Sequence, residues 1–196
     1  MTFIETFSEN EAAGPVAAMY ATERETRGHV PNSALAFSRR PSVYAAWREL
    51  VGAITSTMDP RLYELASLAA ARRLRSSYCM LADGSVLLKL GFDPAELRAV
   101  VEDHHAAGLD TIEVAVMDLA DKVAGDAGSV TQDDIDGLRA LGLTDGEITE
   151  VVLAAAARSF FCKTLDALGA EPDERYGALD PEIREALTVG RPIAVS

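Results

Sequence analysis

The sequence predicts an all-α protein, and three observations carry this prediction. Apolar residues recur along nearly every segment at the i, i+3, i+4 spacing of one helix face. Alanine, the best helix former, is abundant, whereas aromatic residues, which favour strands, make up only 6% of the 196 residues. Helix-capping residues also punctuate the chain at helical intervals. We therefore expect a packed set of helices without a clear strand.

Capping residues define the predicted helices of the first half of the chain. Gly28 follows an amphipathic segment and is a typical C-terminal cap. Asp59 and Pro60 form a strong start signal, because Asp accepts from free N–H groups and Pro fits the first helical position. The expected helices span residues 9–27, 41–54, 59–75 and 76–90, and another begins at residue 93.

Similar signals divide the second half. Thr131 is a predicted cap, and Thr144 with Glu147 has capping-box spacing. Gly169 is expected to end the long alanine-rich helix. The tail from Glu171 is rich in proline, and we expect it to wrap the surface or a neighbouring subunit. The expected helices span residues 110–125, 131–141 and 144–168.

Composition limits the classes of function. The net charge of −13 argues against a nucleic-acid partner and against an anionic membrane surface, since both require basic faces. The N-terminal residues do not resemble a signal peptide, and no apolar run approaches the ~20 residues of a membrane span. Two cysteines far apart do not form a disulfide framework. We expect one domain over residues 1–196, a cytoplasmic location and reduced thiols.

The candidate chemistry centres on Cys79. Ser76, Cys79 and Asp83 are three and four residues apart, so they share one face of the helix expected to begin near Ser76. A reactive cysteine attacks as the thiolate, which a helix N-terminus or nearby positive charge stabilises. The basic residues just upstream, Arg72, Arg73 and Arg75, are the expected source of that charge.

These residues also resemble a known family. Glu64, Ser76, Cys79 and Asp83 have the offsets of the signature of the alkylhydroperoxidase D-like (AhpD-like) and carboxymuconolactone decarboxylase superfamily, which is Glu, then Cys-x-x-Cys, then His. The segments 28–32, 40–47 and 138–161 resemble further parts of the same family, so the resemblance extends from about residue 10 to residue 175. It implies an AhpD-like helical domain with terminal extensions.

The resemblance also implies roles for the signature residues. Cys79 falls on the position that attacks peroxide, and Glu64 falls on the proton-relay carboxylate. Ser76 replaces the resolving cysteine and Asp83 replaces the histidine, so the Cys-x-x-Cys disulfide cannot form. An oxidised Cys79 then needs Cys162, a thiol of another subunit or a small thiol for its reduction. A carboxylate beside Cys79 opposes thiolate formation, whereas a helix start favours it.

Each candidate also has a structural interpretation. Cys79 can be a small buried hydrophobe, and Cys162, on an apolar helix, is interpreted as a core residue. Glu64 either pairs with Arg61 on the surface or is partly buried with a raised pKa. Asp83 precedes a glycine and can be a polar contact at a bend.

No cofactor or metal is expected. His104 and His105 are adjacent and should face different directions on a helix, which argues against a histidine metal site. No glycine-rich phosphate loop follows a strand, so nucleotide binding has no support.

Three functions remain open at this point. The first is a thiol-dependent, alkylhydroperoxidase-like peroxidase that uses Cys79 as a single cysteine, assisted by Glu64 and a thiol reductant. The second is an acid–base enzyme of the lactone decarboxylase type, acting on a small molecule through Glu64 and Asp83. The third is a non-catalytic helical oligomer on the same fold.

The apolar helix stripes predict a homo-oligomer, because one small layer of helices cannot bury all of them, and the resemblance implies a dimer, trimer or hexamer. We expect light scattering at micromolar concentration to give a multiple of the 20.9 kDa chain mass. A monomeric mass would contradict this expectation.

Overall fold

The computed structural model describes residues 2–195, and within this range all regular structure is helical. There are ten α-helices and two short 3₁₀ helices in the described residues. The α-helices are α1 (Pro15–Arg27), α2 (Asn32–Ala36), α3 (Pro41–Thr55), α4 (Pro60–Arg73), α5 (Ser77–Lys89), α6 (Pro94–Asp103), α7 (Thr111–Asp126), α8 (Gln132–Ala140), α9 (Asp145–Leu168) and α10 (Pro181–Leu187). The all-α prediction is confirmed.

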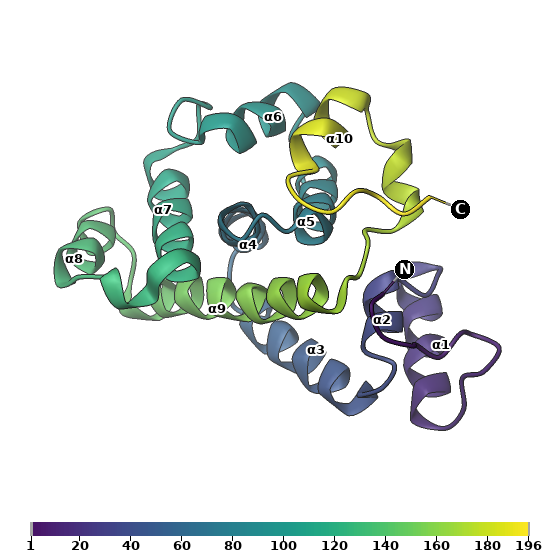
Figure 1. Cartoon of the computed structure of the whole chain (residues 1–196). Helices are drawn as coiled ribbons and strands as arrows, with labels where there is room; N and C mark the ends of the chain where they lie inside the picture. Colours follow the sequence, from purple (N-terminus) through teal and green to yellow (C-terminus); the bar gives the residue numbers. More distant parts are fainter. Residues whose placement is uncertain (1, 196) are drawn as a thin grey trace.

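Helix α4 is the centre of the molecule. It packs against α5, α7 and α9, and Figure 1 shows it end-on between them. Leu65 and Leu68 of α4 are completely buried, as is the alanine run that follows them. These alanines have small side chains, which lets neighbouring helices approach α4 closely. Helix α4 thus holds α5 and α9 side by side, and these two helices carry the candidate residues.

Two outer groups of helices cover this centre. Helices α1, α2 and α3 lie on one side of α9, whereas α6 and α10 lie beyond α5 (Figure 1). Trp47 of α3 stacks on Phe161 of α9 with ring centroids 3.8 Å apart. Phe37 stacks on the same Phe161 ring at 5.7 Å. This aromatic cluster fixes the N-terminal helices against α9.

The predicted caps are confirmed, and one boundary is corrected. The side chains of Asp59, Thr131 and Thr144 accept hydrogen bonds from backbone N–H groups at the starts of α4, α8 and α9. The first helix begins at Pro15 rather than at residue 9, and the residues before Gly14 do not form a helix. Proline at the first helical position sets this start.

The C-terminal tail lies on the surface of its own chain, one of the two arrangements that the sequence predicted, and it includes a helix that the sequence did not predict. It packs on its own chain and forms α10, in which Ile183 and Leu187 are buried against α5 and α6. A β-carbon at Gly84 of α5 would lie 2.7 Å from Leu187, so the glycine permits this close approach. Helix α5 runs straight through Asp83 and Gly84, and the expected bend there is wrong.

Asp173 fastens the beginning of the tail to two other parts of the chain. Its carboxylate accepts from the Tyr78 hydroxyl of α5 at 2.7 Å and from the Asn32 N–H of α2 at 2.7 Å. The Tyr78 oxygen in turn accepts from the Ser33 N–H at 3.0 Å. We call this group of four residues the Asp173 clamp. No helix within residues 2–195 is long and apolar enough to cross a membrane.

We predict that Asp173→Ala lowers the free energy of unfolding by about 2–3 kcal/mol, because it leaves buried donors without their charged acceptor. Urea denaturation followed by circular dichroism measures this, with Lys163→Ala on the exposed face of α9 as the control. A loss no larger than that of the control would show that the clamp contributes nothing to stability.

Candidate active site

A polar cavity of about 390 Å³ lies where α3, α4, α5 and α9 meet the tail. Its centre is an ion pair between Arg158 of α9 and Asp83 of α5, with 2.8 Å between Nη2 and Oδ1. Both side chains are nearly inaccessible to solvent. The other principal lining residues are Trp47, Tyr63, Glu64 and Tyr78. The structure therefore brings two of the predicted residues, Glu64 and Asp83, to one cavity.

Glu64 and Asp83 differ in their protonation. Burial and the neighbouring Asp83 charge raise the pKa of Glu64 to about 8, and Arg158 opposes this only in part. Burial raises the pKa of Asp83 to about 6, although Arg158 lowers it. Near neutral pH the cavity therefore holds a protonated Glu64 beside an ionised Asp83. One group can donate a proton while the other remains a paired charge.

The guanidinium of Arg158 stays charged. Burial acts to lower the pKa of Arg158, but Asp83 and, to a smaller extent, Tyr63 and the two cysteines raise it well above its usual value. An arginine buried in this way supplies a fixed positive charge to its surroundings.

Several polar atoms that line the cavity have no hydrogen-bond partner among the described residues. They are Trp47 Nε1, Glu64 Oε2, Asp83 Oδ2 and Arg158 Nε. Leaving a buried polar group unpaired costs about 1–3 kcal/mol, so such atoms are usually satisfied by water or ligand. Two donors and two carboxyl oxygens are therefore free to bind a small polar molecule.

Cys79 lies directly behind this cavity. It occupies the third position of α5, where backbone N–H groups of the first turn lack helical acceptors, and it is completely buried. Its neighbours on the helix, Tyr78 and Asp83, line the cavity, and Arg158 is close enough to interact with its charge. The helix N-terminus and Arg158 both contribute positive electrostatic potential near this sulfur.

The second cysteine lies near the same ion pair. Cys162 of α9 is completely buried, as expected for a core residue, and it follows Arg158 by four residues, whereas Cys79 precedes Asp83 by four. The ion pair of Arg158 with Asp83 therefore joins the two helices one turn from each cysteine. Burial raises the pKa of Cys162, and its interaction with Cys79 raises it further.

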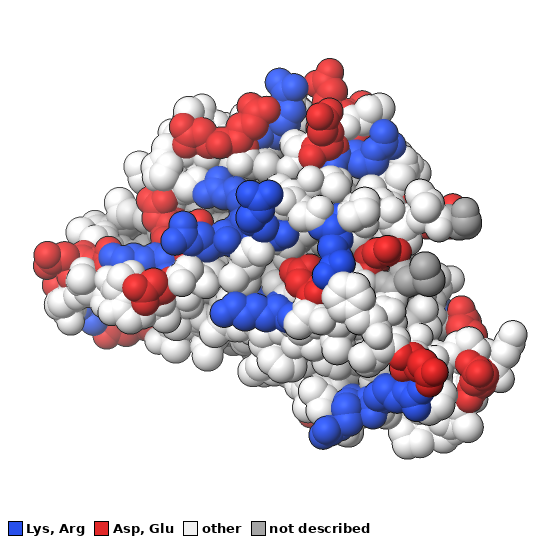
Figure 2. All heavy atoms as spheres, in the orientation of Figure 1, with Lys and Arg blue, Asp and Glu red and all other residues white. Residues whose placement is uncertain are grey.

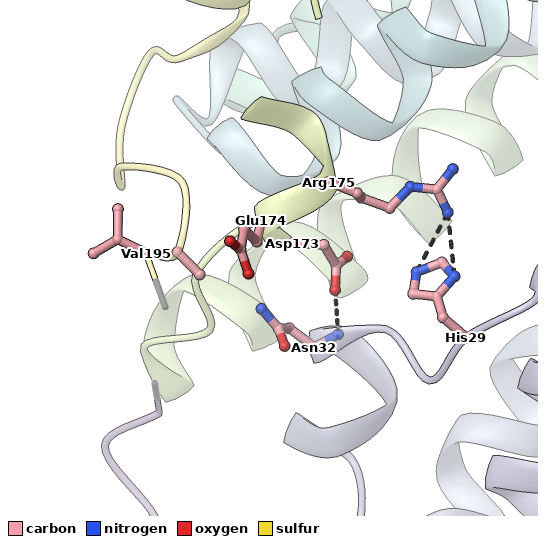
Figure 3. Close-up of a pocket in the computed structure, with 7 residues that line it drawn as sticks. His29, Asn32, Asp173, Glu174, Arg175 and Val195 are labelled. Carbon is pink, nitrogen blue, oxygen red and sulfur yellow. Dashed lines mark hydrogen bonds between the residues drawn. The ribbon is translucent and has the colours of Figure 1, made fainter. Parts of the chain in front are cut away.

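The outer wall of the cavity is formed by the start of the tail and the linker before α2, and we call it the roof. Figure 3 shows this region from the outer side, where a second hollow is lined by His29, Asn32, Asp173, Glu174, Arg175 and Val195. Arg175 Nη1 lies 3.2 Å from His29 Nδ1, so tail and linker touch directly here. His29, Asp173 and Arg175 also line the inner cavity. These side chains therefore separate the two hollows.

The basic residues upstream of Cys79 do not surround it. Arg72 and Arg73 reach Asp121 of α7, each at 3.9 Å, and Arg75 donates to the carbonyl of Val189 in the tail. Figure 2 shows basic side chains gathered in the middle of one face, over α4 and the start of α5 in the orientation of Figure 1, with acidic side chains over α8 and α6. The expected source of positive charge is therefore wrong, and Arg158 takes that place.

Two further expectations need correction or completion. Arg61 pairs with Glu113 and stacks over Phe92, so the proposed surface pair of Glu64 with Arg61 is wrong and the partly buried interpretation holds. Ser76, at the start of α5, is completely buried, and its hydroxyl has no hydrogen-bond partner among the described residues.

His104 and His105 do not face different directions. Both rings reach Asp118, at 2.8 Å and 3.0 Å, and their centroids are 4.1 Å apart. With Asp103 they form a group of potential ligand atoms. However, Arg72 points a donor at His104 Nδ1, 3.1 Å away, so Nε2 carries the proton and donates to Asp118. This is the opposite of the state that a metal-binding Nε2 requires.

Sequence reasoning missed Arg158 and Asp173. Arg158 shares a helix face with Phe161, Cys162 and Leu165, at spacings of three, four and seven, and an arginine on such an apolar face signals a buried charge. Asp173 lies in an irregular segment, where no periodicity reveals burial.

Comparisons with known proteins agree with the fold and with the signature. The sequence model of the Carboxymuconolactone decarboxylase family matches residues 41–122, which include Glu64, Cys79 and Asp83. A search of curated proteins found no match. The chain is therefore similar to this family over the helices that carry the candidate residues, and it shares the helical fold of the solved structures described next.

Solved structures share this architecture at low sequence identity. A peroxidase-related protein with the alkylhydroperoxidase AhpD core, from Ralstonia eutropha, is 19% identical with a TM-score of 0.80, over 89% of this chain and 94% of that one. A peroxidase-related protein from Silicibacter is 20% identical with a TM-score of 0.77, over 91% and 98%. The debrominase Bmp8, in complex with 2,3,4-tribromopyrrole, is 14% identical with a TM-score of 0.74, over 95% and 98%.

We predict that stability falls as pH rises from about 5 to 8. A carboxyl group whose pKa is raised on folding binds its proton more tightly in the native state, so the native state loses stability as the pH passes its folded pKa. In Glu64→Gln, the decrease in the free energy of unfolding over this pH range should be smaller by at least about 1 kcal/mol, which corresponds to roughly one pKa unit.

Urea titrations at several pH values measure this, with Glu49→Gln on the exposed surface as the control. Equal slopes for wild type and Glu64→Gln would show that Glu64 is not the group responsible.

Proposed function

We propose that the protein is a thiol-dependent, peroxidase-like antioxidant protein in which Cys79 attacks a hydroperoxide. The observation that carries the proposal is the position of Cys79 in the first turn of α5, beside Arg158 and next to a cavity that holds a protonated carboxyl group. The similarity to peroxidase-related structures supports it.

The cavity residues would divide the reaction between them. The Cys79 thiolate attacks the outer oxygen of the hydroperoxide, the O–O bond breaks, and Cys79 becomes a sulfenic acid. The inner oxygen leaves with the electron pair, and Glu64 donates its proton to form the alcohol or water. Asp83 does not take part as a proton donor, because it is ionised and paired with Arg158, but it positions that guanidinium. An external thiol returns the enzyme to its reduced form.

The buried position of Cys79 limits the size of the peroxide that can react with it. Cys79 does not line the cavity, so a peroxide reaches it only past Tyr78 and Asp83 of the same helix. Small peroxides should therefore react faster than bulky ones.

An acid–base reaction on a small molecule is the second candidate. The observation in its favour is that Glu64 and Asp83 line the cavity with different protonation states, whereas Cys79 does not line it. Such an enzyme would depend on Glu64 and would not need the thiol. The two candidates therefore differ in which variant abolishes turnover.

We predict that Cys79→Ser abolishes consumption of hydrogen peroxide in the presence of dithiothreitol, because a serine hydroxyl is not a redox nucleophile. Glu64→Gln should lower the rate by about 10²-fold or more, the usual contribution of a general acid. Hydrogen peroxide should be consumed faster than cumene hydroperoxide. Peroxide consumption followed by absorbance measures all three.

Glu49→Gln is the matched control for Glu64→Gln and should retain full activity. Unchanged peroxide consumption by Cys79→Ser would disprove the thiol mechanism. A catalysed reaction that survives Cys79→Ser and is lost in Glu64→Gln would establish the acid–base alternative.

A further inference from the structure

We infer that Cys162 is the resolving thiol of Cys79, so that oxidation produces a disulfide between α5 and α9 rather than one within a single helix turn. This inference rests on the proposed function, because the disulfide forms on oxidised Cys79. It assigns a chemical role to a residue that the sequence alone indicated as core.

The first argument is the contact itself. Helices α5 and α9 pack together, and the 2.8 Å ion pair between Asp83 and Arg158 joins them. Cys79 precedes Asp83 by four residues and Cys162 follows Arg158 by four, so each cysteine lies one helical turn from this ion pair on the same helix face. The interaction of Cys79 with Cys162 agrees with this placement.

The second argument is that the other candidates are badly placed. Ser76 stands where the signature has its resolving cysteine, but a hydroxyl cannot form a disulfide. External thiols must first pass the cavity to reach Cys79, because its side chain is completely buried. A neighbour held in contact reacts at an effective concentration far above that of any thiol in solution. Cys162 is thus the first thiol that an oxidised Cys79 meets.

The chemistry balances without any further oxidant. Cys162 gives up its proton, its sulfur attacks the sulfenic sulfur of Cys79, the S–O bond breaks, and the hydroxyl leaves as water with a proton. An external dithiol, the class of reductant that the proposal requires, then reduces the disulfide to two thiols and is itself oxidised. The raised pKa of Cys162 keeps it protonated in the resting state, which suits a residue that reacts second.

A single positive charge, that of Arg158, acts on both cysteines. Arg158 interacts with both cysteines and is paired with Asp83. Its positive charge opposes the rise in the pKa of Cys162 that burial causes. The same arginine would therefore serve both half-reactions.

The experiment treats the full-length wild-type protein, Cys162→Ser and Cys79→Ser with one equivalent of hydrogen peroxide, with and without dimedone, and measures intact mass and peptide maps. In the wild type we expect the loss of two hydrogen atoms, a mapped Cys79–Cys162 crosslink and little dimedone adduct. In Cys162→Ser we expect a lasting sulfenic acid on Cys79, trapped by dimedone, with at least a tenfold increase in adduct. Circular dichroism confirms that the variants are folded.

The outcomes separate the two proposals. A dimedone adduct of equal yield in wild type and Cys162→Ser, without a crosslink, would overturn the role of Cys162 and leave the proposed function intact. No oxidation of Cys79 in any variant would overturn the proposed function and, with it, the resolving role.

Diamide, which oxidises neighbouring thiols without peroxide, tests the pairing alone. A diamide crosslink that is absent from both single variants supports the pairing of the sulfurs whatever the peroxide result. Failure of diamide to link the cysteines in the folded wild type would contradict their assignment as a pair.

Discussion

The buried ion pair between Arg158 and Asp83 is the interaction on which the rest of the site depends. It joins α5 to α9 across the cavity, and each charge makes the other tolerable in the interior. Removing one partner of such a pair typically costs about 3–5 kcal/mol, because the remaining charge is left uncompensated. The pair also affects the charges around it: Arg158 interacts with both cysteines, and burial together with the Asp83 carboxylate keeps the proton on Glu64. The same ion pair therefore contributes both to the stability of this region and to the charge around its reactive groups.

Much of the fold could be predicted from local sequence, because its signals are local. The caps at Asp59, Thr131 and Thr144 act within three residues, so their effect is visible in the sequence itself. The start of α5 beside Cys79 could be predicted in the same way. The tail was the exception, since α10 is only seven residues long and is held by contacts with α5 and α6 that no local pattern encodes.

The site could be predicted only in part, for a related reason. The spacing of Glu64, Cys79 and Asp83 placed them correctly on consecutive helices. Arg158 and Cys162 come from a helix far along the chain, and only the packing of α9 against α4 and α5 brings them to the same place. Charge nearby in sequence was misleading, because Arg72 and Arg73 lie on the side of α4 that faces α7. Long-range packing decides which charges a thiol experiences.

The division of the cavity into a helical floor and an irregular roof has a consequence for how such a protein can diversify. The floor consists of α4, α5 and α9 and holds every group assigned to the chemistry, whereas the roof comes from the linker before α2 and the start of the tail. Segments outside regular helices tolerate substitution better than a packed core does. Changes at His29 and Arg175 could thus alter which molecules enter, while the reactive groups beneath stay as they are. Substrate selectivity and chemical reactivity would then be encoded by different segments of the chain and could change independently.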